Sequence, residues 1–275
     1  MPELPEVEVV RRGLVAKITN RKVIDVILRR EGLRWPFPSD LREKLLHQRV
    51  GDIQRRGKYL LIASGNTGHL LVHLGMTGSF VWYDSAPKHS AHDHLDIVFE
   101  QGVLRYNDPR RFGAVLWINP SPDAGLPGHA LLETLGIEPF DDAFNGELLF
   151  RLSRGRKVSV KQFLLAGHAV VGVGNIYCSE TLFRAGVRPG RAAGRVTKAE
   201  YLKLALAIKE ILASAIEQGG STLRDFKNSS GESGYFQLTY FAYNRQGKPC
   251  RVCNNPIRLI RQQQRASYFC ASCQK

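Results

Sequence analysis

The segment CRVCNNPIRLIRQQQRASYFCASC, residues 250–273, contains two pairs of cysteines; each pair encloses two residues, and 16 residues separate the pairs. This spacing is typical of a structural zinc site, in which each pair occupies two corners of a tetrahedron and a hairpin returns the second pair to the first. Two disulfides are the alternative, but they are rare in the cytosol, where we expect this protein because we find no secretory signal. We therefore predict one structural zinc ion and no redox or organic cofactor. Its ligands are Cys250, Cys253, Cys270 and Cys273.

The charge of the chain indicates its partner. Its 275 residues include 39 Lys and Arg against 25 Asp and Glu, a formal net charge of +14. After Glu232 there is no acidic residue, whereas seven basic residues follow it. Such an excess is typical of polyanion binders, although a merely solvated basic tail stays open for the zinc segment. The sequence has neither a long apolar run nor a lysine-rich amphipathic segment, so it favours nucleic acid over a membrane surface.

Upstream of the zinc segment, residues 199–220 carry apolar side chains at helical spacing and end at a Gly pair, which predicts a helix that stops there. The predicted apolar stripe comprises Leu202, Leu206, Ile208, Ile211, Leu212 and Ile216. The residues that follow, 219–240, begin with a stretch rich in Gly and Ser and are expected to form a loop.

A glycine-rich turn at residues 170–174, VVGVG, leads into a predicted helix with Asn175 near its start. The exposed N–H groups and positive dipole of a helix start can bind phosphate, and glycines permit close approach. Arg156 and Lys161, upstream of the turn, favour this interpretation, although ordinary packing between helices explains such a turn equally well. The pattern is similar to a helix-turn-helix motif.

The region 23–118 contains short runs rich in Val, Ile, Leu and aromatic residues, separated by Gly or Asp turns. We predict strands within residues 23–30, 58–63, 68–80, 94–100 and 114–118. These runs indicate an antiparallel sandwich or barrel. Residues 119–128 concentrate Pro and Gly and are expected to belong to an interdomain linker.

Two Gly-flanked turns of this β region carry bulky groups: HLGMTGSF contains Met76, and NDPRRFGA contains Arg110 and Phe112. Exposed apolar groups beside arginines are suited to unstack bases and to fill the space left by an extruded nucleotide. Met and Phe at strand ends belong more often to a core, so that alternative stays open. Another turn offers possible metal ligands, although phosphate or base contact fits its basic surroundings better. These residues are His89, His92, Asp93 and His94.

The chain opens with MPELPE, which places Pro2, Glu3 and Glu6 together at its start. Removal of Met1 would leave the secondary amine of Pro2 as the terminus. An α-amino group has a pKa of roughly 8 against roughly 10.4 for lysine, so far more of it is unprotonated and nucleophilic at neutral pH. Attack on a sugar C1′ would yield an iminium, with Glu3 as proton donor and Glu6 stabilising the cation. An acidic N-cap on a frayed terminus is the alternative.

Six motifs now extend over nearly the whole chain: PELPEVE, QRRGKYLL, HLGMTGS, LRYNDPRRFGA, GVGNIY followed by SE, and the zinc segment with QRASYFC. In this order they resemble the bacterial formamidopyrimidine-DNA glycosylases, which remove 8-oxoguanine from DNA. The resemblance implies an α+β fold: an N-terminal helix with an antiparallel β-sandwich, a helical helix-two-turn-helix domain and a C-terminal zinc-finger β-hairpin with four cysteine ligands. It also implies a bifunctional glycosylase and abasic-site lyase of base excision repair.

The resemblance assigns roles to single residues. Pro2 matches the Schiff-base nucleophile and Glu3 the proton donor. Lys58 matches the proton donor of β-elimination and Arg265 the residue that serves δ-elimination. The void-filling wedge corresponds to Met76, Arg110 and Phe112, and the DNA-contacting positions correspond to His92, Arg110, Arg156, Lys161 and Asn175. At His92 the chain departs from the family pattern Lys-His-Asp-His, because it reads SAHDH with Lys88 displaced upstream.

The resemblance also implies four segments: a catalytic sandwich domain at 1–118, a linker at 119–130, a helical domain at 131–240 and a zinc finger at 241–275. Residues 219–240 would form the loop that closes over the flipped base. We expect a monomer that acts on double-stranded DNA containing oxidised bases or abasic sites. One alternative is the related glycosylase for oxidised pyrimidines, which typically has Gly where this chain has Leu4. The other is a non-catalytic protein that binds damaged DNA.

Overall fold

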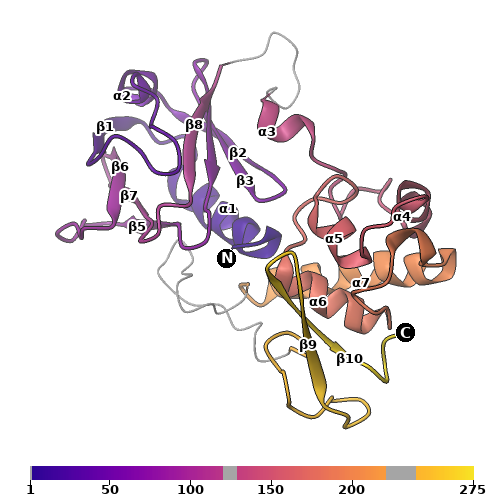
Figure 1. Cartoon of the computed structure of the whole chain (residues 1–275). Helices are drawn as coiled ribbons and strands as arrows, with labels where there is room; N and C mark the ends of the chain where they lie inside the picture. Colours follow the sequence, from indigo (N-terminus) through magenta and orange to yellow (C-terminus); the bar gives the residue numbers. More distant parts are fainter. Residues whose placement is uncertain (1, 120–128, 221–239) are drawn as a thin grey trace. The chain divides into compact units, whose positions relative to one another are not determined.

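The computed structural model describes residues 2–119, 129–220 and 240–275 (Figure 1). The chain divides into two compact units. The first comprises residues 1–133 and 218–235, and the second comprises 134–217 and 236–275. Most of the expected linker at 119–130 and of the expected loop at 219–240 lies outside the described residues, and the bounds of the four expected segments stay predictions.

The first unit begins with helix α1, Leu4–Ile18, whose N-cap is Glu3. Pro5 lies in its first turn, where a missing N–H costs nothing, so the chain enters the helix in a fixed direction. Apolar side chains three or four residues apart give the helix one buried face. The residues of this face are Leu4, Val7, Val10, Leu14 and Ile18.

Two antiparallel sheets of four strands form the body of this unit, which confirms the predicted sandwich fold. Their strand orders are β1-β6-β7-β5 and β2-β3-β4-β8. The strands are β1 (Val23–Leu28), β2 (Val50–Arg56), β3 (Tyr59–Ser64), β4 (Gly68–His73), β5 (Ser79–Tyr83), β6 (Asp93–Phe99), β7 (Gly102–Asn107) and β8 (Ala114–Ile118). The short helices of the unit are α2 (Leu41–Leu45) and α3 (Ala130–Glu133).

Apolar side chains from both sheets and from α1 form a common core. Leu60 and Leu70 from one sheet, Leu95 and Leu104 from the other, and Leu14 from α1 are all fully buried in it. The run 68–80 proves to be two strands, β4 and β5, with the Met76 turn between them. The turn therefore starts and ends on rigid strands.

The second unit contains the helices α4 (Gly146–Ser153), α5 (Val160–Leu165), α6 (Asn175–Arg184) and α7 (Lys198–Glu217), with the 3₁₀ turn η1 (Ala193–Arg195). Helix α7 ends just before Gly219 and Gly220, both of which have positive φ, as the Gly pair predicts. The predicted stripe of α7 is wrong at two positions, because Leu202 is 46% and Leu206 61% exposed. Tyr201 and Leu204 occupy the buried face instead.

The last element is an antiparallel hairpin of β9 (Ile257–Gln262) and β10 (Arg265–Cys270). Gln262 pairs with Arg265, so Gln263 and Gln264 form a two-residue turn, and both have positive φ. This backbone geometry is the one that matches the twist of a tight hairpin. No helix in the described ranges combines the length and the apolar character that a membrane span requires.

Candidate functional site

The N-terminal residues are buried and locked into the start of α1. Pro2 is buried, and Glu3 and Glu6 are both 0% exposed. The backbone N–H of Glu3 donates to Oε2 of Glu6 at 2.8 Å, and the side chain of Glu3 accepts from the backbone of Glu6. This reciprocal capping satisfies two N–H groups that have no acceptor within the helix. Glu3 and Glu6 therefore fix each other at the start of α1.

A second set of contacts ties α1 to the turn that carries Lys58. Glu8, on α1, accepts a hydrogen bond of 3.2 Å from Arg55 on β2, and Arg55 also donates to the carbonyl of Gly57. Burial disfavours the charge of Glu8, but hydrogen bonds from Arg11 and Arg12 and the nearby charge of Arg55 outweigh this and lower its pKa to about 2. The carboxylate thus stays ionised and holds the Lys58 turn to α1. Sequence reasoning did not identify Glu8 or Arg55.

His73 is a further neighbour of Lys58 that the sequence analysis missed. Burial, together with the positive charges of Lys58 and Arg34, lowers the pKa of His73 to about 4, so the ring is neutral at physiological pH. Its Nδ1 accepts a hydrogen bond of 3.0 Å from the backbone of Gly75. The remaining proton is therefore on Nε2, and the ring fixes the start of the Met76 turn.

The predicted wedge residues lie at loop tips. Met76 is 36% and Phe112 46% exposed, although both are large apolar side chains. The guanidinium of Arg110 stacks over the Phe112 ring with 4.7 Å to its centroid. Gly75 has φ +64, and a side chain there would collide with the backbone of Phe112 and Gly113. The two turns are therefore packed against each other.

The histidine-rich turn does not gather a metal site. His92 is exposed, whereas His94 is buried and its Nε2 bonds the carbonyl of Asp108 at 2.9 Å. Asp93 accepts from the backbone of Ser90 and from Asn107. Among the residues that the structure describes, the only group suited to hold a metal ion is the four cysteines.

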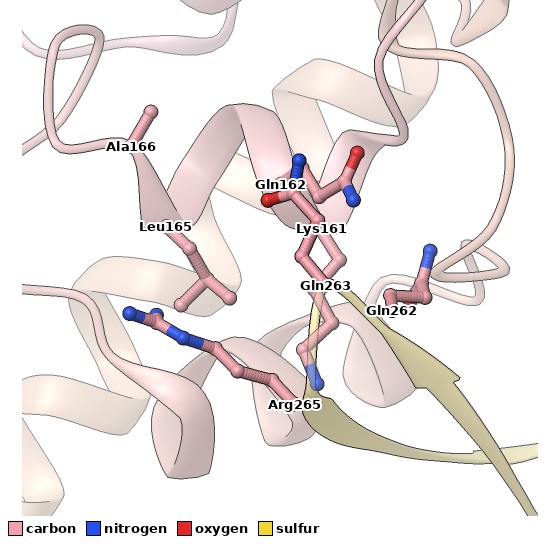
Figure 2. Close-up of a pocket in the computed structure, with 7 residues that line it drawn as sticks. All are labelled: Lys161, Gln162, Leu165, Ala166, Gln262, Gln263 and Arg265. Atoms are coloured by element: carbon pink, nitrogen blue, oxygen red, sulfur yellow. The ribbon is translucent and has the colours of Figure 1, made fainter.

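In the second unit, a cavity of about 270 Å³ lies between α5 and the hairpin (Figure 2). Figure 2 shows the side chain of Arg265 extending from the hairpin toward Leu165. The cavity is lined by Lys161, Gln162, Leu165, Ala166, Gln262, Gln263 and Arg265. It therefore unites two predicted site residues, Lys161 and Arg265, with amide side chains that can donate to oxygen atoms.

The two cations of this cavity differ in exposure. Arg265 is exposed, whereas Lys161 is only 1% exposed. The ammonium of Lys161 donates to the carbonyl of Ala266 at 2.7 Å and to Oγ of Ser179 at 3.4 Å. A buried ammonium needs such partners. Lys161 thus connects α5, α6 and the hairpin, a structural role that its basic character alone did not indicate.

The other two predicted DNA-contacting residues of this unit do not line the cavity. Asn175 is the first residue of α6, after Gly174 as N-cap, and its Oδ1 is buried and has no hydrogen-bond partner among the described residues. A buried polar atom without a partner is rare in proteins and often marks a binding position. Arg156 lies in the exposed segment after α4.

The four cysteines fit one zinc ion. Their Sγ atoms all lie within 4.8 Å of one another. Cys250 and Cys273 are 3.9 Å apart, and Cys253 and Cys270 are 3.4 Å apart. Four thiolates at about 2.3 Å from a tetrahedral zinc ion would be separated by about 3.8 Å. The hairpin therefore already has the geometry of a zinc site with four cysteine ligands.

Glu180 on α6 is a functional residue that the sequence analysis missed. It is 4% exposed, and its carboxylate accepts hydrogen bonds from the backbone of Phe241, Ala242 and Tyr243 at 2.7 to 3.0 Å. Burial raises its pKa, although the three N–H donors oppose this. The carboxylate fixes the chain where it enters the zinc finger. Its only signal in the sequence is an acidic residue within an otherwise buried helix.

Comparison with family models covers both units. Residues 1–115 match the model described as the formamidopyrimidine-DNA glycosylase N-terminal domain. Residues 135–227 match the formamidopyrimidine-DNA glycosylase H2TH domain, and residues 247–275 match the zinc finger found in FPG and IleRS. The three models follow the order of the predicted segments.

Curated relatives match along their whole length. The chain is 55% identical over 284 residues to the formamidopyrimidine-DNA glycosylase of Cupriavidus pinatubonensis and 57% identical over 278 residues to that of Paraburkholderia phytofirmans. Both alignments cover 100% of each chain. The chain therefore spans the full length of these two relatives.

Solved structures show the same fold. The MutM (Fpg) protein of Thermus thermophilus is 34% identical with a TM-score of 0.88, over 99% of this chain and 98% of that one. A complex of Lactococcus lactis Fpg with DNA containing an abasic site is 31% identical with a TM-score of 0.90, over 99% of both chains. A complex of the same protein with DNA containing N7-benzyl-Fapy-dG is 32% identical with a TM-score of 0.90, over 100% of both. The protein described here belongs to the formamidopyrimidine-DNA glycosylase family.

Proposed function

We propose that this protein is a bifunctional DNA glycosylase and abasic-site lyase of base excision repair, which removes oxidised purines such as 8-oxoguanine and formamidopyrimidines. The observation that carries the proposal is the fixed N-terminus, where Pro2, Glu3 and Glu6 are buried together at the start of one helix. A terminal amine must be held in place to act as a nucleophile. Membership of the family supports the same activity.

The first step uses the nitrogen of Pro2 after Met1 has been removed. The nitrogen attacks C1′ of the extruded nucleotide, a bond from nitrogen to C1′ forms, and the bond from C1′ to the base breaks. The attacking nitrogen gives up its proton, and the departing base takes up one proton. The nitrogen lone pair then expels O4′ from C1′, Glu3 protonates O4′, and an iminium results. Glu6 accepts a hydrogen bond from the backbone N–H of Glu3 and so fixes the backbone that carries this carboxyl group.

The second stage cleaves the strand. The iminium acidifies the proton on C2′, and its loss expels the 3′ phosphate in β-elimination. Lys58 is proposed as the proton donor of this step, and the turn that carries it is held to α1 by Glu8 and Arg55. Loss of the C4′ proton then expels the 5′ phosphate in δ-elimination, for which Arg265 is the assigned residue. Its exposed guanidinium suits contact with a phosphate.

Recognition uses the exposed turns and the basic surface. Met76, Arg110 and Phe112 are proposed to enter the duplex and occupy the space of the extruded nucleotide, because their side chains are exposed at neighbouring loop tips. His92, Arg156 and Asn175 are proposed to contact the DNA backbone. The zinc ion, held by the four cysteines, would only shape the hairpin that presents Arg265.

We further propose that the protein works as a monomer in the cytoplasm, bound to the nucleoid. The net charge of +14 favours binding to DNA that does not depend on the base sequence. Four cysteines within one metal site suit a reducing compartment, because thiolates rather than disulfides bind the ion. Sedimentation of the free protein would test the monomer.

A borohydride trap tests the proposed function. The protein is incubated with three duplexes, which contain 8-oxoguanine opposite cytosine, an oxidised pyrimidine or no lesion. We expect a covalent adduct and strand cleavage with 8-oxoguanine in preference to the other two. Preference for the pyrimidine lesion would indicate the related glycosylase instead. Tight binding without any adduct would indicate a non-catalytic protein.

A further inference from the structure

Asp108 is a buried carboxylate that the proposed chemistry does not use. It is 0% exposed. Its Oδ1 accepts a hydrogen bond of 2.5 Å from the hydroxyl of Thr77, and its Oδ2 accepts one of 2.8 Å from the backbone of Gly113. Thr77 follows Met76 in the chain, and Gly113 follows Phe112. The two oxygens of one carboxylate therefore bind the two turns that carry the wedge.

The backbone of the same residue reaches the histidine turn. The N–H of Asp108 donates to the carbonyl of His92 at 3.0 Å, and its own carbonyl accepts from the ring of His94. The hydroxyl of Thr77 in turn accepts from the backbone N–H of Arg110 at 3.2 Å. Three segments with proposed DNA-contacting residues thus share one buried residue.

Close packing against Tyr106 restricts both turns. The ring of Tyr106 is 0% exposed, and a side chain at Gly78 or at Gly113 would collide with its hydroxyl. Burial and the charge of Asp108 raise the pKa of Tyr106, so this hydroxyl stays protonated beside the carboxylate. The two glycines therefore allow both turns to close on Tyr106 and Asp108.

We propose that Asp108 and Thr77 form a positioning pair that holds the Met76 turn and the Arg110–Phe112 turn in one arrangement before DNA binds. This inference rests on the proposed function. The wedge then enters the duplex as a preformed unit, and no ordering of the two turns opposes its insertion. Without the pair, the two loop tips would move independently, and extrusion of a paired base would slow.

The sharpest test is Thr77→Val, which keeps the branched shape of the side chain and removes the hydroxyl. It leaves Oδ1 of Asp108 and the N–H of Arg110 without this partner. We expect the extrusion rate, measured by 2-aminopurine beside the lesion, and the single-turnover excision of 8-oxoguanine to fall about tenfold, the effect of one lost hydrogen bond to a charged group. Cleavage of a preformed abasic site, which has no base to extrude, should change less than about twofold.

One conservative variant should keep the wild-type behaviour. Thr77→Ser retains the hydroxyl that donates to Asp108. It should stay within about twofold of the wild-type excision rate. Thr181→Val is a matched control, because Thr181 is also 0% exposed and its hydroxyl bonds the carbonyl of Cys178 within α6.

The outcomes separate the two proposals. If Thr77→Val alone slows extrusion and spares abasic-site cleavage, while Thr77→Ser and Thr181→Val behave as wild type, the positioning pair is supported. Equal loss of both reactions, or no loss, would overturn it even though the wild-type enzyme is active. If the wild-type protein itself forms no adduct with 8-oxoguanine DNA, the proposed function fails first.

Discussion

The ammonium of Lys161 donates a hydrogen bond of 2.7 Å to the carbonyl oxygen of Ala266, the residue that follows Arg265. Arg265 itself is exposed and lines the same cavity as Lys161. Arg265 also starts β10, directly after a two-residue turn. The buried lysine therefore holds the hairpin backbone next to the side chain assigned to δ-elimination.

Replacement of this lysine by methionine should change the products of strand cleavage. Lys161→Met keeps the length and apolar contacts of the side chain but removes the bond to Ala266. We expect the ratio of δ- to β-elimination products to fall several-fold, because Arg265 loses its fixed position, while borohydride trapping at Pro2 persists. Gel analysis of the cleaved strand measures this ratio. An unchanged ratio at full zinc content would show that Lys161 does not position Arg265.

Zinc removal should act on DNA binding before it acts on the sandwich. The cluster around the cysteines contains only a few buried side chains, including Ala242 and Ile257, so it cannot form a core large enough to fold alone. We expect a chelator to weaken binding of an abasic-site duplex by more than tenfold and to leave the near-ultraviolet signal of the sandwich intact. Retained affinity after measured loss of one zinc ion per chain would refute this.

Acid stability should depend on Glu8. Its pKa is about 2 in the folded protein against 4.5 for an ordinary glutamate. The stabilisation is therefore complete above pH 4.5 and is lost as the pH falls toward 2. We expect Glu8→Gln to lower the free energy of unfolding by about 2 kcal/mol at pH 7, less than the full shift implies because Arg11 and Arg12 are partly exposed. Urea unfolding from pH 7 to 3 should show the difference shrinking below pH 4.5; a constant difference would contradict the ion-pair explanation.

Even a conservative substitution of Glu180 should weaken its hydrogen bonds to the backbone of the residues that lead into the zinc finger. A glutamine offers one acceptor oxygen where the carboxylate uses two to receive the backbone of Phe241, Ala242 and Tyr243. Glu180→Gln would leave at least one buried N–H without its partner, at a cost of roughly 1–3 kcal/mol. Hydrogen exchange of these three amides is the measurement, and protection equal to that of the wild type would contradict the assigned anchor.

The sequence predicted those features that depend on local pattern. Cysteine spacing is set by the tetrahedron of a zinc ion, and a Gly pair ends a helix through its backbone freedom, so the hairpin and the end of α7 could both be predicted. Strand β2, VGDIQRR, was missed because its buried residues Val50 and Ile53 are three positions apart, where a register shift interrupts the alternation that is typical of a strand. The stripe of α7 failed at Leu202 and Leu206, which lie opposite Leu204 and Ile208 on a helix of 3.6 residues per turn.

The candidate site shows the same division. The candidate roles of Pro2, Glu3 and the cysteines could be predicted from the sequence, because they follow from the functional groups and their spacing. Asp108, Glu180 and His73 act through contacts with residues distant in the chain, and such contacts leave no local pattern. The exposure of Met76 and Phe112 could only be stated as one alternative, because an apolar residue at a strand end is as compatible with a core.

The most direct test of the proposed mechanism is to identify the amine that reacts with the sugar. Protein and duplex containing 8-oxoguanine are joined with borohydride, digested, and the peptide that carries the reduced sugar is sequenced by mass spectrometry. We expect the sugar on the nitrogen of Pro2 at the mature terminus, with no conjugate when that nitrogen is acetylated. A conjugate on the side chain of Lys58, or on any other lysine, would contradict it.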